Sequence, residues 1–327
     1  MEEILPNLYR IEIPLPQNPL GAINSYVIKS GESSLIIDTG MNQEKCARVL
    51  LAGLKKLSVD LERADYFITH WHADHLAGVV NVATDTSVVH LSHVEASVIN
   101  SGRYEHWERF PEFLRRSGFP ETDLQRVVKT YSSPKYRPTK MLDIRPVREG
   151  DEIVIGDYTF RCIETPGHSP GHMCLYEPGK KVFVSGDHIL PEVTPIIALM
   201  SYEENPLREY LESLEKICNL DVKLVLPAHG NVFDNFKERV EELKQHHKRR
   251  TDEVLAILGK GEQSAFTVAS QMTWDVAYQS WQRFPASQKW FACGEALAHL
   301  KYLEAAGKVR RKEQDGGIFF SLRQATV

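Results

Sequence analysis

The densest group of reactive side chains in the sequence is a run of histidine and aspartate that contains His70, His72, Asp74 and His75 within six residues. Imidazole and carboxylate groups are common ligands of borderline divalent metals. In an extended segment, residues two apart point to the same side, so His70 and His72 can face one point. Asp74 and His75 follow where the chain turns and can face a second point. A lone H-x-H pattern is weak evidence, but these four residues predict a pair of metal ions.

Two ions would need more ligands than these four, so further histidines or carboxylates are expected at other strand ends. The four residues themselves follow a predicted strand over 64–69 and precede a predicted helix that begins at residue 76. Three more candidates also follow predicted strands and lie beside Gly or Pro: His168 after 158–164, Asp187 after 181–185, and His229 after 222–226. Gly and Pro permit sharp turns and close backbone approach. The elements that must position the site are therefore strands that present their ends at one edge of a scaffold.

With these residues in place, the chain resembles the metallo-β-lactamase superfamily, whose five motifs occur here in order. The motifs are Asp38 in Leu35-Ile-Ile-Asp38-Thr-Gly40, the run His70-x-His72-x-Asp74-His75, and then His168, Asp187 and His229. The resemblance covers residues 5–245. It implies an α/β (α+β) fold, the αββα sandwich, in which two mixed sheets lie face to face between helices and the metal site lies along one edge.

The resemblance also implies which residues bind metal. The implied sets are His70, His72 and His168 for one ion, Asp74, His75 and His229 for the other, and Asp187 as the bridge. Asp38 would accept hydrogen bonds from the metal-binding loop or a ligand ring; the alternative is an ordinary turn aspartate before Gly40. Position 72 is glutamate in the flavodiiron-type oxidoreductases of the superfamily, so His72 favours a hydrolase. Zn suits these ligands best, and Fe or Mn are alternatives.

Two such ions can share a water molecule, lower its pKa and hold it as a hydroxide nucleophile, while they polarise the electrophile's oxygen. Asp74 could accept a hydrogen bond from that hydroxide and orient it, which makes Asp74 the candidate catalytic residue. His172 and His188 lie beside motif residues and are not expected to be ligands; they either support the ligands or have surface or packing roles. The remaining histidines have no motif around them and are expected to be structural or solvated.

Residues 92–140, between the second and third motifs, lack strand alternation and are rich in aromatic and basic side chains. They are expected to form a helical insertion. One interpretation is a lid over the metal site, with apolar walls for an acyl chain and cations for a carboxylate or phosphate. The other is a helical hairpin packed on the sandwich. The insertion would belong to a catalytic domain over 1–245, which a C-terminal domain over 246–327 follows.

The C-terminal segment has a different pattern. Short helices are predicted over 252–258 and 265–272, a longer helix over 288–306, and a hairpin around Asp315-Gly316-Gly317. This order resembles the winged-helix domain of superfamily members similar to the lactamase-β-like 2 group, which is associated with single-strand endoribonuclease activity. From residue 251 onward there are nine Lys and Arg and eight Asp and Glu, a net charge of 9 − 8 = +1. Nucleic-acid surfaces carry a marked basic excess, so a structural or homodimer-forming role is favoured.

Composition bounds the remaining choices. In this chain of 327 residues, an apolar fraction of 42%, a charged fraction of 25% and a mean hydropathy of −0.32 exclude a disordered or membrane-spanning protein. The net charge of −5 gives no field that would gather nucleic acid or anionic membrane. No apolar leader is evident near the N-terminus, so a cytoplasmic protein is expected. The five cysteines are scattered and include no Cys-x-x-Cys pair, which predicts reduced packing residues.

The leading hypothesis is a dinuclear metal-dependent hydrolase of thioesters or related carboxylic esters, as in the glyoxalase II and thioesterase branches of the superfamily. A thiolate leaves with little proton donation, and the sequence offers no dedicated general acid. The C-terminal segment departs from glyoxalase II, which puts a glutathione substrate in doubt. The alternative is a metal-dependent single-strand endoribonuclease. A lactonase and a non-catalytic binding protein are further alternatives, although the latter would require loss of ligands that are all present. The expected partner is a small ester or thioester; nucleic acid is not favoured, and no membrane is expected.

Overall fold

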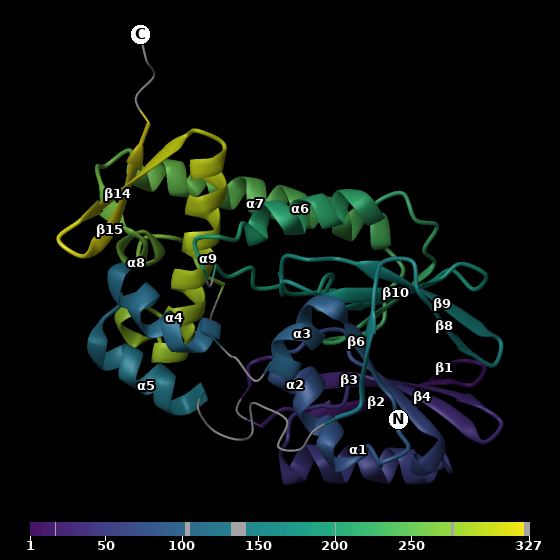
Figure 1. Cartoon of the computed structure of the whole chain (residues 1–327). Helices are drawn as coiled ribbons and strands as arrows, with labels where there is room; N and C mark the ends of the chain where they lie inside the picture. The colour runs from purple at the N-terminus through teal and green to yellow at the C-terminus, as the bar shows by residue number, and fades with distance from the viewer. Residues whose placement is uncertain (17, 102–104, 132–141, 200, 276–277, 324–327) are drawn as a thin grey trace. The chain divides into compact units, whose positions relative to one another are not determined.

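The computed structural model describes the chain except for residues 17, 102–104, 132–141, 200, 276–277 and 324–327 (Figure 1). It divides into two compact units that are each built from several stretches of chain. The first unit comprises residues 1–102, 133–195 and 215–240, and the second comprises 103–132, 196–214 and 241–327. The first unit contains all the predicted motifs.

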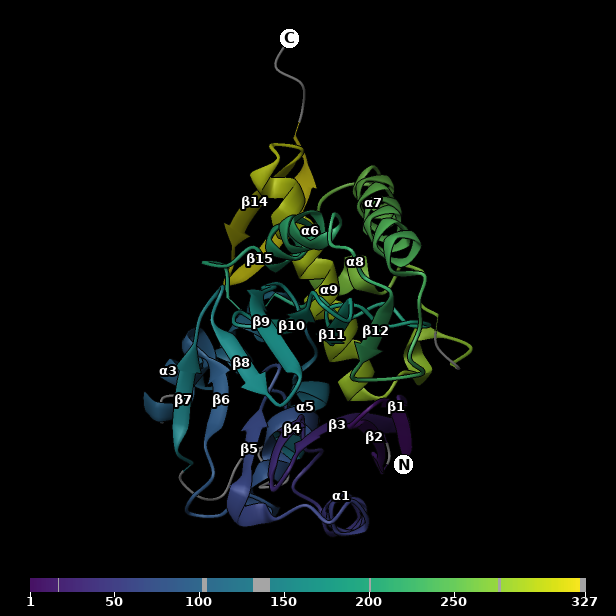
Figure 2. The same ribbon diagram turned by 90° about the vertical axis from the view of Figure 1, so that its right-hand side faces the viewer.

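Two sheets form the first unit (Figures 1 and 2). The first sheet has the order β1-β2-β3-β4-β5-β6-β7 and the second β12-β11-β10-β9-β8. The strands of the first are β1 (Glu2–Leu5), β2 (Leu8–Pro14), β3 (Ala22–Ser30), β4 (Ser33–Ile37), β5 (Ala64–Phe67), β6 (Val89–Ser92) and β7 (Ile144–Val147). Those of the second are β8 (Glu152–Ile155), β9 (Tyr158–Glu164), β10 (Met173–Glu177), β11 (Val182–Gly186) and β12 (Leu224–Pro227).

Alternation along the strands gives each sheet two apolar faces. In β3, Tyr26 and Ile28 belong to the core between the sheets, whereas Ile23 and Val27 belong to the core on the other face of the first sheet. That outer core also contains residues of α1 (Glu44–Lys56), α2 (Ala73–Leu76), η2 (Ala77–Asn81) and α3 (His93–Ser101). On the second sheet, Phe183 of β11 contacts Phe236, the first residue of α7 (Phe236–Leu258). These layers confirm the expected αββα sandwich.

The strand directions bring the predicted motifs to one edge. β4 and β5 are parallel, so their carboxyl ends lie together. In the second sheet, β10 is antiparallel to both β9 and β11, and β12 is parallel to β11. The carboxyl ends of β9, β11 and β12 therefore also share one edge. The Met173 N–H donates to the Thr69 carbonyl at 2.9 Å, which joins the two sheets at that edge.

Helix α3 of the insertion belongs to the first unit, and residues 105–131 of the insertion belong to the second unit. The elements of the second unit, in chain order, are α4 (Glu105–Arg116), α5 (Glu121–Tyr131), most of α6 (Pro206–Ile217), the rest of α7, β13 (Gln263–Ser264), α8 (Ala265–Ala269), η4 (Trp281–Arg283), α9 (Ala286–Ala305), β14 (Val309–Gln314) and β15 (Gly317–Leu322). Helices α4 and α5 pack against β15 and α9, with Phe110 on Trp290 and Lys289 paired with Asp123 at 2.8 Å. The sequence analysis expected the insertion to cover the metal site or to pack on the sandwich, and neither interpretation anticipated that α4 and α5 pack against β15 and α9. Residues 102–104 and 132–140 of the insertion lie outside the described part.

The hairpin expected around residue 316 is present. Strands β14 and β15 pair in register from Val309 with Leu322 to Gln314 with Gly317, and Asp315 and Gly316 both have positive φ, as a type I′ turn requires. Residues 252–258 are helical as expected, but they do not form a separate short helix. No Gly or Pro interrupts residues 236–258, and α7 runs through them without a break. Because α7 crosses residue 245, the domain boundary placed there stays a prediction.

Two expectations from composition concern the whole chain. Within the described part, no helix is long and apolar enough to cross a membrane. All five cysteines are free, and all except Cys218 are buried. Burial raises the pKa of Cys162 and of Cys174 to about 12, so these thiols stay protonated and behave as packing residues.

Candidate metal centre

The second motif forms the loop between β5 and α2. Thr69 and His70 follow the strand, His72 immediately precedes α2, and Asp74 and His75 lie on that helix. The helix begins at Ala73, three residues before the predicted start. The His75 N–H donates to the His72 carbonyl at 3.0 Å, so the first helical turn ties the two halves of the motif together.

The structure brings the seven predicted ligand residues together at this edge. Potential ligand atoms lie within 4.8 Å of one another in three sets: His70, His72 and His168; Asp74, His75 and His229; and His70, His75 and Asp187. The first two sets have the membership that the resemblance implies. Asp187 lies between them, because its oxygens are 3.4 Å from His168 Nε2, 3.4 Å from His229 Nε2 and 3.5 Å from His75 Nε2.

The buried polar atoms of this cluster fit a cation. His70 Nε2, His75 Nε2, His229 Nε2 and Asp187 Oδ1 are buried and have no hydrogen-bond partner among the described residues. Such atoms are rare in folded proteins and need an explanation. The other ring nitrogens are engaged: Nδ1 of His75 lies 2.8 Å from Asp38 Oδ2, and Nδ1 of His229 lies 2.6 Å from the Ala22 carbonyl. These contacts leave an Nε2 lone pair facing the cluster, as metal ligation requires.

Asp38 supports the loop from the end of β4. It is buried and accepts hydrogen bonds from Thr69 N at 2.9 Å, from Thr69 Oγ1 at 2.8 Å, and from His75 Nδ1 at 2.8 Å. Its φ of 56° places it in the left-handed region, which Asp tolerates better than most residues. The position therefore does more than close a turn: it orients one ring of the cluster and the backbone beside another.

Charges inside the cluster are arranged for cation binding. Burial, together with neighbouring histidines, lowers the pKa of His70 and of His72 well below the usual value, so both rings are neutral. Burial opposes charge on Asp187, but His229 and His75 outweigh it and hold its pKa well below the usual range. Burial opposes charge on His75 too, but Asp38 and Asp187 outweigh it and raise the pKa of that ring well above the usual value. His70, His72 and Asp187 therefore have the protonation states that metal ligands adopt, and a cation would take the place of the His75 proton.

His172 contacts the cluster without belonging to any of the three sets. Its Nε2 accepts a hydrogen bond from the Asp187 N–H at 3.1 Å, and its Nδ1 lies 2.8 Å from Thr165 Oγ1. It thus holds the main chain of Asp187. His188 is buried as well, and burial lowers its pKa to about 3.

Several supporting residues were missed by sequence reasoning. Asn24 Nδ2 and Tyr26 OH both donate to the Pro227 carbonyl, at 2.9 and 2.8 Å, and so hold the loop of His229. Glu95 was missed as well, and it contacts the loop that follows His168. These contacts join residues far apart in the chain, so no local pattern marks them.

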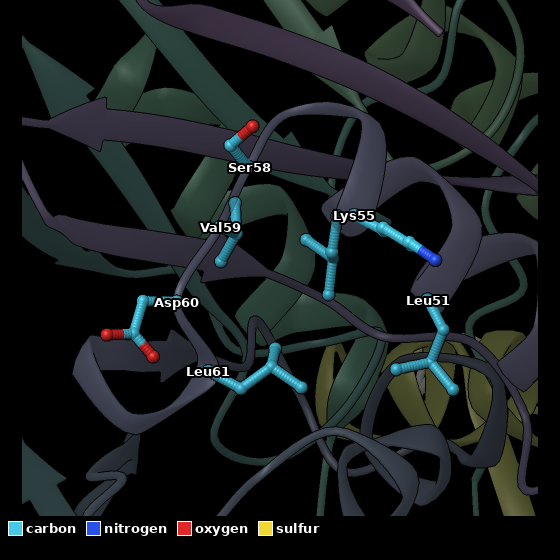
Figure 3. A pocket seen from close by; sticks show the side chains of 7 residues that line it. Leu51, Lys55, Ser58, Val59, Asp60 and Leu61 are labelled. Atoms are coloured by element: carbon cyan, nitrogen blue, oxygen red, sulfur yellow. The ribbon is translucent and has the colours of Figure 1, made fainter.

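A surface pocket of about 500 Å³ lies at the C-terminal end of α1 (Figure 3). It is lined by Leu51, Leu54, Lys55, Ser58, Val59, Asp60 and Leu61. None of the cluster residues lines it, so the chemistry has to be sought at the sheet edge.

The fold and the histidine cluster together define a class of protein, and the comparisons agree. Residues 18–229 match the family described as the metallo-beta-lactamase superfamily, and residues 253–323 match the metallo-beta-lactamase-like C-terminal domain. The chain belongs to the metallo-beta-lactamase superfamily and is a metal-dependent hydrolase.

Relatives extend over most of the chain. The probable metallo-hydrolase YqjP of Bacillus subtilis is 26% identical over 95% of this chain and 96% of its own. The beta-lactamase-like protein 2 homolog of Caenorhabditis elegans is 26% identical over 75% and 68%, and the atrochrysone carboxyl ACP thioesterase of Emericella nidulans is 26% identical over 80% and 67%. The crystal structure of a metallo-beta-lactamase family protein from Thermus thermophilus has a TM-score of 0.81 at 26% identity, covering 98% of this chain and 100% of that one.

Proposed function

We propose that the cluster holds two Zn²⁺ ions and that the enzyme hydrolyses thioesters or related carboxylic esters. The proposed ligands are His70, His72 and His168 for one ion, Asp74, His75 and His229 for the other, and Asp187 between them. The support is the convergence of unpartnered Nε2 atoms on a shared ionised carboxylate. Imidazole and carboxylate donors suit Zn²⁺, and Fe or Mn are accepted by the same donors.

A pair of bound metal ions would supply an activated water molecule and would polarise the carbonyl oxygen of the ester. In this cluster Asp74 is the more accessible carboxylate, with 18% of its side chain exposed against 9% for Asp187. One Asp74 oxygen lies 3.6 Å from His229 Nε2 and the other 3.9 Å from His75 Nε2. Asp74 can therefore accept a hydrogen bond from the attacking water and orient it, which is the catalytic role proposed for it.

The leaving group decides the substrate class. Burial lowers the pKa of both His172 and His188, so neither is an imidazolium at neutral pH, and Nε2 of His172 already accepts the Asp187 N–H. A thiolate leaves without protonation, whereas an alkoxide leaving group benefits from a general acid. The observation that carries the choice is the similarity to a protein named as an acyl-carrier thioesterase over 80% of this chain.

A single-strand endoribonuclease is the second candidate. Similarity to the beta-lactamase-like protein 2 homolog favours it, as does a winged-helix-like order of α7, α8, α9 and the β14–β15 hairpin, which we infer for the C-terminal elements. The charge distribution opposes it, because many basic side chains in the second unit are paired with carboxylates. Such pairs are Arg116–Glu313, Arg311–Glu304, Lys312–Glu262, Lys289–Asp123, Lys248–Asp252 and Arg250–Glu253. RNA phosphates would have to displace these carboxylates.

A substrate panel on metal-analysed protein tests the proposal. The panel contains acyl thioesters of increasing chain length, lactones, phosphodiesters and single-stranded RNA, with His72→Ala as the matched variant. We expect two equivalents of metal and thioester turnover that is lost in His72→Ala. RNA cleavage that is lost in the same variant, with no thioester turnover, would overturn the choice of substrate and leave the metal site in place.

A further inference from the structure

Glu95 is a buried glutamate on the first turn of α3, and its carboxylate makes hydrogen bonds outside its own helix. It is 1% exposed, and its N–H donates to Ser92 Oγ at 3.4 Å. The spacing S-x-x-E is that of a capping box, in which the glutamate side chain would turn back to the backbone of the capping serine. Here the carboxylate instead contacts the loop after β9, so a local helix-stabilising pattern is used for a long-range contact.

The carboxylate of Glu95 contacts two loops that carry proposed ligands. The Ser169 hydroxyl and the Gly171 N–H, the latter at 3.2 Å, donate to Glu95 Oε1. The main-chain N–H of Trp71 lies near the carboxyl and lowers its pKa, while Oε2 has no hydrogen-bond partner among the described residues. Ser169 is the neighbour of His168 in the chain, and Trp71 lies between His70 and His72. One buried side chain therefore holds the loop of His168 and lies beside the loop of His70 and His72, and these two loops present all three members of one proposed ligand set.

Gly171 makes this contact possible. A Cβ atom at residue 171 would lie 2.3 Å from Ser92 Oγ, 2.6 Å from Glu95 Cγ and 3.0 Å from Val94 Cβ. These distances are far below van der Waals contact, so any side chain there would push α3 away from the turn. The glycine lets the start of α3 approach the loop closely enough for a glutamate to reach both main chains.

The other proposed ligand set is supported by different groups. His75 is oriented by Asp38, and His229 by the Ala22 carbonyl. We propose that Glu95 is a positioning residue for one metal ion only, the ion held by His70, His72 and His168, because it sets the spacing between their two loops. This inference rests on the proposed metal site and names a residue that determines the affinity of one of its two positions.

Glu95 acts through hydrogen-bond acceptance. Burial raises its pKa to about 7, while the Ser169 hydroxyl and the N–H groups of Trp71 and Gly171 lower it. All three contacts are neutral donors. A neutral acceptor of the same shape can keep the two contacts made by Oε1, so Glu95→Gln should retain part of the function that Glu95→Ala loses.

Metal affinity tests this directly. Metal-free wild-type protein and variants are titrated with Zn²⁺ in competition with a chromophoric chelator, and both dissociation constants are fitted. Losing a partner that orients a ligand weakens metal binding by about 10- to 100-fold. We expect that loss at one ion in Glu95→Ala, a smaller loss in Glu95→Gln, and an unchanged second ion. Co²⁺ absorption spectra give an independent readout of the geometry at the affected position.

Paired variants identify which ion is affected. In a His229→Ala background, where the remaining ion is the one near Glu95, Glu95→Ala should lower its affinity by the same factor as in wild type. In a His168→Ala background it should have no effect. Equal weakening in both backgrounds, or none in either, overturns the inference. A wild-type protein that binds no ion overturns the metal site itself and this inference with it.

A matched control and a milder variant separate positioning from folding. Glu177 is also buried, lies at the far end of β10 and accepts a hydrogen bond from the Lys180 N–H. Glu177→Ala should leave both affinities unchanged; a loss equal to that of Glu95→Ala would show a general folding effect and refute the specific role. If Glu95→Ala does not fold, Ser169→Ala removes one donor only and should weaken the same ion.

Discussion

Acid should destabilise the second unit through His299, a buried histidine of α9. Its Nδ1 donates to the Glu295 carbonyl at 2.8 Å, and its Nε2 lies 3.3 Å from Nδ1 of His247. Burial lowers the pKa of His299 to about 3, against about 6.5 in an unfolded chain. The unfolded state thus takes up a proton at a pH where the folded state does not. The stability that His299 contributes is fully present above pH 6.5 and is lost as the pH falls toward 3.

The size of this loss follows from the two pKa values. At pH 5, protonation of this histidine stabilises the unfolded state relative to the folded state by about 2 kcal/mol. This value follows because pH 5 lies roughly 1.5 units below the unfolded pKa, and each unit is worth about 1.36 kcal/mol. Replacing His299 with Gln removes the titration and keeps an oxygen that can accept from His247. The fall in stability between pH 8 and pH 5 should therefore be about 2 kcal/mol smaller in His299→Gln than in wild type.

Hydrogen exchange of the α9 amides, corrected for the intrinsic rate at each pH, measures the free energy of opening around α9. A local measurement is needed because a chain of two units need not unfold in a single step. Leu300→Ala is the matched control. It removes an equally buried neighbour, should cost about 2–5 kcal/mol, and should keep the wild-type pH dependence because no titrating group is lost. Identical pH dependence in wild type and His299→Gln would refute the reasoning.

Three further outcomes are expected at the metal centre. Asp74→Ala should abolish turnover with the fold retained; a variant that keeps most of its activity and its bound metal contradicts the role of Asp74. Asp38→Asn removes a charged acceptor from His75 and should weaken metal binding by about 10- to 100-fold by chelator competition; a change below about twofold would contradict it. Gly78→Ala places a Cβ atom 2.4 Å from the Thr39 carbonyl oxygen and should cost about 1–3 kcal/mol in thermal unfolding; an unchanged melting temperature would show that the helix can shift freely.

The candidate ligands were accessible from the sequence because each follows its strand directly. His168 comes four residues after the end of β9, and Asp187 and His229 come one and two residues after β11 and β12. A strand fixes where its end lies, and parallel ends meet at one edge, so local pattern and topology together predict the cluster. The β14–β15 hairpin was equally local, since Asp315-Gly316 specifies the turn.

Long-range contacts had no such pattern. The sequence by itself determined the seven-residue cluster, because strand ends and turn residues are local properties, and the order of the motifs carried the resemblance that implied the sandwich and the support from Asp38. Only the tertiary structure decided that α4 and α5 pack with α9, that α7 is continuous, and that Glu95 turns from its own helix to the loops of Trp71 and Ser169. Those choices depend on which buried donors and apolar faces meet across the fold, and that is settled by packing many segments at once.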